Sequence, residues 1–357
     1  MEQNSIKKPR SFSISSFITK WFSPINRTKT VETPRPSPYD YTPMDDYNNT
    51  SFEDSKTTIN TKVTMCCVTW NMHGLKPTIG NIKTLLDKHN NFDIYAIGSE
   101  ECLNSIAKST LFKDDKTEWE NMLQNYFGNN FYKLDSKTLN AIHLIIFVRA
   151  IYKSKINKIG NDSKKTGWRG VCGNKGGVGV WFNLFDVSFL VINSHLAAGF
   201  SKAEKRNNDF VTIFNDIYSK AGYSHFVVFM GDLNYRLTLN IKQVKGFLST
   251  DKNFLSLLEF DQLKDAKQFD KCIATNFKEG KIEFNPTFKF NDGTCDYNMN
   301  SDDHVPSWTD RILYRKQPGT NTVFDVVLNE YNSQPDVLIS DHKPVYAYFT
   351  FTIEHEL

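Results

Sequence analysis

Several features are scarce in this sequence of 357 residues, and each scarcity excludes a class of protein. No apolar run approaches the roughly 18 residues that a membrane-spanning helix needs, which excludes an integral membrane protein built from helices. The six cysteines form no CxxC pair and are too sparse for a disulfide scaffold, which also excludes a zinc framework of cysteine pairs. The formal net charge is only +3, which excludes a highly basic nucleic-acid packaging protein.

The remaining composition is that of a folded protein. Hydrophobic residues make up 39% of the chain, whereas a wholly disordered chain would carry fewer apolar and aromatic residues. The length is sufficient for one large domain with a sizeable core. Because no secretory signal peptide is visible, we expect reduced thiols and a cytoplasmic protein.

Residues 1–60 differ in composition from the rest of the chain. They hold six of the 12 prolines and no glycine, and they show no sustained hydrophobic period. Basic residues predominate in 1–30 and acidic residues in 31–60, and the basic half also carries bulky aromatic side chains. This composition predicts a disordered polar tail. The basic half suits peripheral contact with an anionic membrane, and a plain solvated tail fits the composition as well.

From residue 61 onward, short β-rich runs predominate over helical patterns. Several runs are continuously apolar, as expected of strands buried on both faces. Many gaps between the runs are too short for a helix, so we predict an α/β fold with two packed sheets and helices outside them, in one domain over 61–354. The predicted strands cover 63–70, 92–98, 142–148, 178–185, 189–193, 226–230, 323–328 and 345–352, and the predicted helices cover about 78–89, 117–127 and 203–220.

Polar and ionisable residues gather next to the apolar runs, where strands end and a site would lie. A single carboxylate or histidine in such a place is more often a turn or packing residue. Several segments of the same kind favour a common functional site. The segments cover 69–71, 98–101, 193–196, 231–236, 306–313 and 340–344.

The residue types in these segments are consistent with one reaction. Asn71 and Glu101 offer the hard oxygen ligands that suit Mg²⁺. Asp232 can accept a proton from water, and Asn234 can orient that water or an oxyanion. Such groups are suited to the attack of water on a phosphoryl group.

Two histidines and a further carboxylate complete this set. His195 and His342 can donate hydrogen bonds to phosphate oxygens. Asp310 can pair with one of these imidazoles, which would fix its tautomer and favour its charged form.

Two long motifs carry a specific resemblance to a known family. Residues 229–236, Phe-Met-Gly-Asp-Leu-Asn-Tyr-Arg, and residues 306–313, Pro-Ser-Trp-Thr-Asp-Arg-Ile-Leu, are similar to the signature motifs of the inositol polyphosphate 5-phosphatases. The resemblance covers about residues 61–352, and the shorter matching elements recur across the wider endonuclease/exonuclease/phosphatase superfamily. Those shorter elements are 69–71, 173–178, 193–199 and 340–344, in the family's order.

The resemblance implies a fold, an activity and a set of roles. The implied fold is a DNase I-like four-layer α/β sandwich, with two mainly antiparallel or mixed β-sheets flanked by helices. The implied activity is Mg²⁺-dependent removal of the 5-phosphate from a phosphoinositide or a soluble inositol polyphosphate. The implied catalytic residues are Asp232, Asn234, His195, His342 and Asp310, the metal-site residues are Glu101, Asn71 and Asp341, and the substrate-binding residues are Lys175, Asn174 and Lys289, with Arg236 and Arg311 either at the substrate or in structural ion pairs.

The sequence departs from the family pattern at two informative places. Glu100 adds a carboxylate next to Glu101 where the family usually has Gln, and it either raises the local negative charge or points away. Asp302 and Asp303 stand where many relatives have basic residues that bind the 4-phosphate of the ring. Two carboxylates there would repel a 4-phosphate, whereas Lys289 still matches a basic position of the family.

Two other classes of function remain open from the sequence. The first is another phosphoesterase of the superfamily, either a nuclease or a sphingomyelinase; the weak net charge argues against a nucleic-acid partner. The second is a catalytically inactive phosphoinositide-binding adaptor, which would be expected to lack Asp232, His342 or the metal-binding Glu. All three are present, and the sequence identifies no protein partner.

Overall fold

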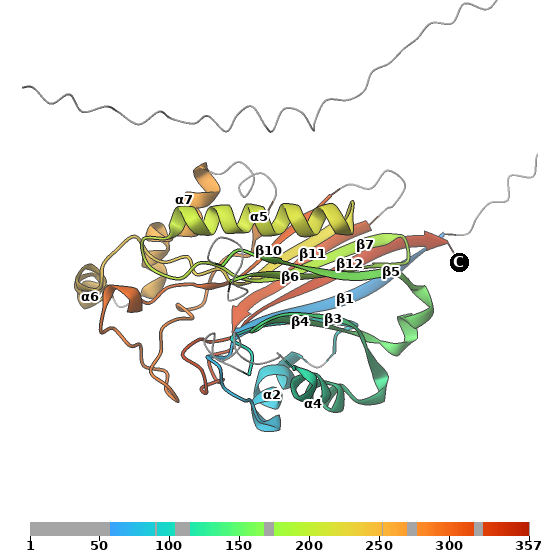
Figure 1. Ribbon diagram of the computed structural model, residues 1–357, viewed down its shortest axis with the longest axis horizontal. Coiled ribbons are helices and arrows are strands. Elements are labelled where there is room, and N and C mark those ends of the chain that lie inside the picture. Colours follow the sequence, from blue (N-terminus) through green and yellow to red (C-terminus); the bar gives the residue numbers. More distant parts are fainter. Residues whose placement is uncertain are drawn as a thin grey trace, which may run out of the picture. The chain divides into compact units, whose positions relative to one another are not determined.

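The structure is a computed structural model that describes residues 58–89, 91–103, 115–167, 175–251, 253–269, 277–317 and 324–356. Within these ranges the chain forms two six-stranded sheets with helices outside them (Figure 1). The predicted α/β sandwich is therefore confirmed. The predicted tail up to residue 57, and Asn174, lie outside the described residues.

The first sheet has the strand order β11-β12-β1-β2-β4-β3. Its central pair, β1 and β2, is parallel, whereas the other pairs are antiparallel. Helices α2 and α4 lie on its outer side (Figure 1). The elements are β1 (Thr58–Asn71), β2 (Ile94–Glu100), β3 (Phe131–Leu139), β4 (Ile142–Arg149), β11 (Phe324–Ser333), β12 (Val345–Glu356), α2 (Ile79–Leu86) and α4 (Thr117–Phe127).

The second sheet has the strand order β5-β6-β7-β8-β10-β9. Here β7 and β8 are parallel, and the other pairs are antiparallel. Helices α5 and α7 lie on its outer side (Figure 1). The elements are β5 (Ile156–Lys165), β6 (Gly176–Leu184), β7 (Val187–His195), β8 (Phe226–Asp232), β9 (Lys278–Glu279), β10 (Asp310–Lys316), α5 (Ala203–Ala221), α6 (Ile241–Thr250), α7 (Gln262–Phe269) and the short 3₁₀ turn η6 (Asp302–His304).

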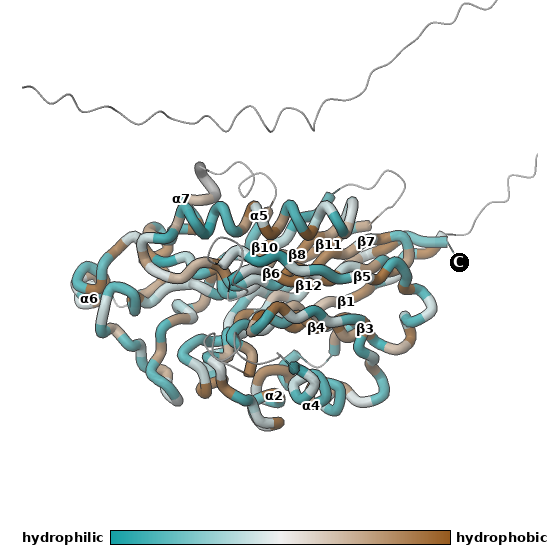
Figure 2. Tube along the Cα trace, viewed as in Figure 1, coloured by the Kyte–Doolittle hydropathy of each residue, from teal (hydrophilic) through white to brown (hydrophobic). Residues whose placement is uncertain are grey.

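Alternation along the strands divides the apolar residues among three layers of core. Along β1, Met65 and Cys67 pack between the sheets, whereas Cys66 and Val68 pack under α2 and α4. The third layer, which includes Phe229 of β8, lies between the second sheet and α5. In Figure 2 hydrophobic positions are frequent along the central strands, whereas the edge strand β5 is largely hydrophilic and the outer helix α5 alternates between hydrophobic and hydrophilic positions. The continuously apolar runs of the sequence are strands that are buried on both faces.

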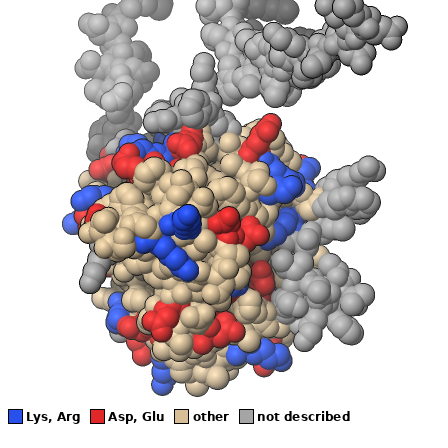
Figure 3. Space-filling view, turned by 90° about the vertical axis from the view of Figure 1, so that its left-hand side faces the viewer, with Lys and Arg blue, Asp and Glu red and all other residues tan. Residues whose placement is uncertain are grey.

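The strand directions bring the polar segments of the sequence to one end of the sandwich. The parallel strands β1, β2, β7 and β8 all end there, and β10 and β12 begin there. This end lies opposite the C-terminal end of β12, at the left of Figure 1, and it faces the viewer in Figure 3. Both Lys or Arg and Asp or Glu side chains occur on the described part of that face (Figure 3).

Helix α5 begins after Lys202 and has no side-chain hydrogen bond at its N-cap. One smaller prediction can also be compared with the structure. Cys66, Cys67, Cys102 and Cys295 are free thiols, as expected. No helix among the described residues is long and apolar enough to cross a membrane.

Candidate active site

Successive side chains of a strand point to opposite faces of its sheet, so only every second polar residue at a strand end points into the space between the two sheets. On β8, Val228 and Met230 point between the sheets, and the same alternation turns Asp232 inward. On β10, Ile312 points inward and so does Asp310, directly beside Asp232 in the register. By the same rule the inward residues at the strand ends are Asn71 of β1, Glu100 of β2, His195 of β7, Asp232 of β8 and Asp310 of β10.

Asp232 lies at the centre of this group and is almost fully buried. Its Oδ2 accepts a hydrogen bond from Asn71 Nδ2 at 3.0 Å and lies 3.1 Å from His195 Nε2. Its Oδ1 accepts from the backbone N–H of Asn234 at 3.0 Å. Burial alone would raise the pKa of Asp232, but the imidazoles of His195 and His342 hold it well below its ordinary value. Asp232 is therefore an ionised carboxylate in a closely packed polar site.

A glycine permits the close approach of the two strands at this point. Gly231, immediately before Asp232, has φ 135°, and a Cβ atom there would lie 1.9 Å from the carbonyl oxygen of Ser194. No other residue type fits that position. The glycine in the motif of 229–236 thus allows Asp232 and His195 to end side by side.

His342 and Asp310 form a second, buried pair. Nδ1 of His342 lies 2.9 Å from Asp310 Oδ2 and 3.1 Å from Oδ1. The hydroxyls of Thr287 and Thr309 both donate to Asp310 Oδ2, at 2.7 and 2.8 Å. Burial by itself would lower the pKa of His342, but the neighbouring Asp310 carboxylate raises it to about 9. The pair is therefore arranged to present a charged imidazolium, with Nε2 as the ring nitrogen not used by Asp310.

Of the residues expected at the metal, Asn71 is buried against Asp232, whereas Glu101 is more exposed. Glu101 follows β2 with a left-handed φ of 47°, and its carboxylate is only half-buried. Among the described residues none hydrogen-bonds or ion-pairs with that carboxylate. The Nδ2 of Asn71 donates to Asp232, and its Oδ1, which accepts from the backbone N–H of His73 at 3.0 Å, is the atom with ligand character. A carboxylate and an amide oxygen are the kind of hard oxygen donors that Mg²⁺ prefers.

Glu100 and Asp341 have different surroundings from Glu101. Glu100 is fully buried between the sheets, where its Oε1 accepts from Thr69 Oγ1 at 3.1 Å, and burial next to Asp310 raises its pKa well above the ordinary value. Because Glu100 is hydrogen-bonded in the interior and the Glu101 carboxylate has no such partner among the described residues, Glu101 rather than Glu100 stays the candidate metal ligand. The oxygens of Asp341 lie 2.7 Å from Lys289 Nζ and 3.1 Å from His73 Nδ1, so Asp341 is ion-paired beside the site.

Three of the predicted substrate-binding cations surround this group. Lys175 Nζ contacts His195 Nε2, and burial lowers the pKa of Lys175 to about 8. Lys289 is held by Asp341. Arg236 donates to Asn234 Oδ1 at 2.7 Å, and its guanidinium lies 4.2 Å from the centre of the Phe288 ring. Arg236 therefore positions Asn234, in addition to placing positive charge near the site.

Among the predicted substrate-binding residues that the structure describes, Arg311 is the one that lies away from the site. It follows Asp310 on β10 and therefore points to the opposite face of the sheet. Its guanidinium pairs with Asp261 and Glu279, each at 2.6 Å, and all three groups are buried. This geometry supports the structural ion-pair alternative for Arg311.

We expect Arg311→Met to destabilise the protein and to leave substrate affinity unchanged. The substitution leaves two buried carboxylates without their cation, which costs about 3–5 kcal/mol. Urea denaturation measures the loss in the free energy of unfolding, and KM is measured on the folded fraction. An increase in KM without any loss of stability would instead show that Arg311 binds the substrate.

The acidic turn η6 is tied to its neighbours through its carboxylates. Asp302 Oδ1 accepts from the N–H of Ile241 at the start of α6, at 2.8 Å. Asp303 Oδ1 accepts from the N–H of Phe200 at 3.2 Å, and its carbonyl oxygen accepts from Arg236 at 3.1 Å. The two carboxylates thus shape the rim of the site.

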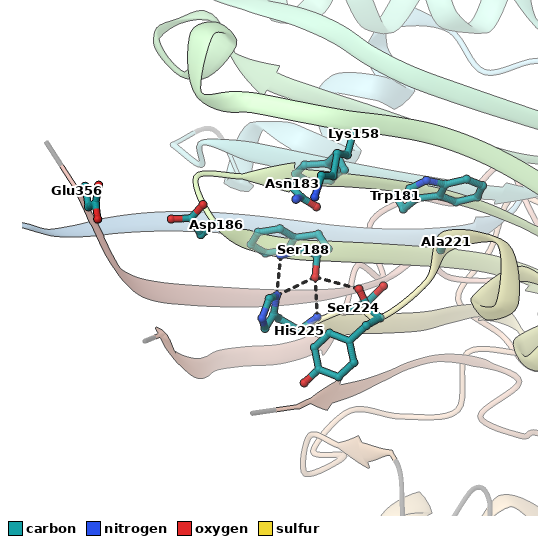
Figure 4. Close-up of a pocket in the computed structure, with 12 residues that line it drawn as sticks. Lys158, Trp181, Asn183, Asp186, Ser188, Ala221, Ser224, His225 and Glu356 are labelled. Carbon is teal, nitrogen blue, oxygen red and sulfur yellow. Dashed lines mark hydrogen bonds between the residues drawn. The ribbon is translucent and has the colours of Figure 1, made fainter. Parts of the chain in front are cut away.

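A separate cavity of about 590 Å³ lies at the other end of the sandwich. It is near the start of β7 and β8, where Ser188 donates from its backbone N–H to His225 Nδ1 at 3.0 Å (Figure 4). None of the predicted site residues lines this cavity. This cavity therefore carries no part of the chemistry described above.

Some residues of the site were missed by the sequence analysis. Thr287 and Thr309 hold Asp310, and Asn193 joins the two sheets by donating to the carbonyl oxygen of His143 at 3.0 Å. Thr309 lies inside the motif of 306–313 and could have been included on that basis. Thr287 and His73 carried no comparable sequence signal, because a lone Thr or His outside a motif is ordinarily a packing or surface residue.

Comparison with known proteins places this geometry in a family. Residues 68–348 match the family described as Endonuclease/Exonuclease/phosphatase family 2. A solved inositol polyphosphate 5-phosphatase domain (IPP5C) of SPsynaptojanin, in complex with inositol (1,4)-bisphosphate and calcium ion, is 30% identical with a TM-score of 0.70, over 85% of this chain and 88% of that chain. The chain therefore belongs to the endonuclease/exonuclease/phosphatase family 2 and, within it, to the inositol polyphosphate 5-phosphatase domains.

Curated relatives extend the comparison to longer proteins. Polyphosphatidylinositol phosphatase INP53 of Saccharomyces cerevisiae is 30% identical over 322 residues, which is 86% of this chain and 28% of that protein. Human Synaptojanin-2 is 33% identical over 287 residues, which is 71% of this chain and 19% of that protein. The chain thus spans less than a third of the length of these relatives. A Cimex nitrophorin, 23% identical with a TM-score of 0.65, has the same fold.

Proposed function

We propose that this domain is a Mg²⁺-dependent phosphomonoesterase that removes the 5-phosphate of phosphoinositides or soluble inositol polyphosphates. The observation that carries the proposal is the ionised, buried Asp232 between His195 and Asn71, directly beside the Asp310–His342 pair. The named activities of INP53 and of related phosphatidylinositol 5-phosphatases support the substrate class.

Each residue of the site has a separate role in the proposed reaction. Asp232 accepts a proton from the attacking water, and Asn234 orients that water or the phosphate. His342, charged through its pairing with Asp310, donates to the phosphate as negative charge develops on it. Lys175 and His195, which contact each other, add further donors to the phosphate. These groups provide the charge stabilisation that phosphoryl transfer requires.

Glu101 and Asn71 would hold the cation in this proposal. When bound, Mg²⁺ supplies Lewis-acid stabilisation of charge on the phosphate oxygens. The half-buried, unpaired carboxylate of Glu101 supports this assignment within the described part of the chain. The solved neighbour contains calcium ion, which is also a hard cation with oxygen ligands.

The proposed substrate is either a phosphoinositide in a membrane or a soluble inositol polyphosphate. Basic and aromatic residues within 1–30 would give peripheral contact with an anionic membrane, at the cytoplasmic face where phosphoinositide headgroups are presented. A soluble inositol polyphosphate would not need this contact. The two sources are distinguished by whether removal of residues 1–57 lowers activity on vesicles while leaving activity on inositol 1,4,5-trisphosphate unchanged.

We expect Asp303→Asn to increase activity on substrates that carry a 4-phosphate. The amide keeps the oxygen that accepts from Phe200 and removes the negative charge. Two like charges about 4 Å apart repel by about 1 kcal/mol in water, so kcat/KM for a 4,5-phosphorylated lipid should rise roughly fivefold. A 3,5-phosphorylated lipid, which has no 4-phosphate, is the matched control. An equal increase in kcat/KM for both lipids would show that Asp303 does not act through the 4-phosphate.

A further inference from the structure

Arg206 of α5 is a buried cation outside the predicted site. Its side chain is fully buried, and among the described residues no carboxylate lies within ion-pair distance of it. Its Nη1 donates to the carbonyl oxygens of Ala197 and Gly199, at 3.0 and 2.7 Å. The guanidinium also lies 5.5 Å from the centre of the Tyr235 ring. A buried charge without a carboxylate partner is costly, so we look for a function that explains why Arg206 is buried here.

The carbonyl oxygens that bind Arg206 belong to the turn that directly follows His195. In the same turn, Leu196 donates its N–H to the carbonyl oxygen of Asp232 at 3.0 Å. The carbonyl oxygen of Leu196 accepts from Asn234 Nδ2 at 3.3 Å. Arg206 therefore fixes the turn that holds the side-chain amide of Asn234.

Gln262, at the start of α7, connects Arg206 to the second loop of the site. Its Oε1 accepts from Arg206 Nη2 at 2.5 Å and from the backbone N–H of Arg236 at 3.0 Å. Its Nε2 donates to the carbonyl oxygen of Phe200 at 3.1 Å. One amide thus joins the turn after β7 to the loop after β8. In that loop Asn234 has a left-handed φ of 57°.

We propose that Arg206 and Gln262 are positioning residues that hold Asn234 in its working orientation; the inference rests on the proposed phosphatase activity. Asn234 is fixed from three directions, by Asp232, by the carbonyl oxygen of Leu196, and by Arg236. Arg206 and Gln262 determine the last two of these contacts. The backbone of Asn234 lies in the sparsely populated left-handed region, and these contacts keep its side chain in one orientation.

The test compares kcat and KM of Arg206→Met, alone and combined with Asn234→Ala. The substrate is a vesicle that contains a 4,5-phosphorylated phosphoinositide, with Mg²⁺. We expect Arg206→Met to lower kcat by roughly 10- to 100-fold with KM nearly unchanged, because an orientation is lost and a binding contact is not. On the Asn234→Ala background the same substitution should lower kcat less than threefold, since residues that act through one group are not additive. Equal losses on both backgrounds would overturn the inference.

Two further variants keep the test decisive. Gln262→Met removes the amide that connects Arg206 to the backbone of Arg236, and it removes no charge. If Arg206→Met fails to fold, Gln262→Met should lower kcat in the wild-type background and much less in the Asn234→Ala background. Arg206→Lys should partly restore kcat. The matched control is Arg315→Met, which removes another buried guanidinium that packs against α5, over Phe214 and Tyr218, and should leave kcat unchanged. An inactive but folded wild-type protein would instead contradict the proposed function.

Discussion

Asp232→Ala is expected to lower kcat for phosphate release by roughly 10²–10⁴-fold while the protein remains folded. The carboxylate is the group that Asn71, His195 and the N–H of Asn234 all contact, and it is the proton acceptor of the proposed reaction. Asp232→Asn keeps the shape of the side chain and removes its charge and basicity, so it should lose a similar amount. The measurement is Mg²⁺-dependent phosphate release at saturating substrate.

The control for Asp232 is a carboxylate of similar chemistry on the surface. Asp216 of α5 pairs with Lys164 and Lys220 at 2.8 and 2.9 Å, outside the site. Asp216→Asn should leave kcat unchanged. Full activity of Asp232→Ala, with its fold verified by circular dichroism, would show that another group accepts the proton.

Asp310→Asn is the second substitution for which we expect a large loss, again roughly 10²–10⁴-fold in kcat. Asp310 holds Nδ1 of His342 and stabilises the charged imidazolium, and an amide in its place does neither well. KM should change less than kcat, because the charge on His342 matters most as negative charge develops on the phosphate.

A remote carboxylate provides the comparison for Asp310. Asp93 is partly buried and pairs with Arg149 at 3.1 Å, but it lies at the start of β2, at the other end of the sandwich from the site. Asp93→Asn should affect stability only. If Asp310→Asn and Asp93→Asn had the same small effect on kcat, His342 would not act through its pairing with Asp310.

Strand alternation explains how much of the site was predictable from the sequence. Apolar runs located the ends of β1, β2, β7 and β8, and a period of two determines that Asp232 points inward. The same period predicts that Asp310 and Arg311 face opposite sides, which resolves the two alternatives for Arg311. The motif around Asp232 therefore contained both the proposed proton acceptor and the direction in which its side chain points.

Other parts of the fold left no clear pattern in the sequence. The edge strands β3 and β5 are polar and half-exposed, so neither a continuous apolar run nor a strict alternation marks them. Gln262 lies 26 residues beyond Arg236 in the sequence, and only the packing of α7 brings the two together. Contacts of this kind depend on tertiary structure and carry no local signature.

The structural role of Asp302 and Asp303 at the rim of the site was also not predictable from the sequence. The sequence predicted that Asp302 and Asp303 would act on a 4-phosphate, but it did not predict that both would accept hydrogen bonds from backbone N–H groups. Their structural role follows from the positions of α6 and the turn at Phe200, which alignment of short motifs does not provide. The requirement for Mg²⁺ and the membrane contact of residues 1–30 stay predictions.

The most direct test of the central claim is phosphate release from a panel of substrates, with Mg²⁺ and with EDTA. The panel contains inositol 1,4,5-trisphosphate and vesicles with 3,4-, 4,5-, 3,5- and 3,4,5-phosphorylated phosphoinositides. We predict release that requires Mg²⁺, that is confined to the 5-phosphorylated substrates, and that Asp232→Ala abolishes. Release from none of these substrates by the folded protein, or equal release in EDTA, would contradict the account.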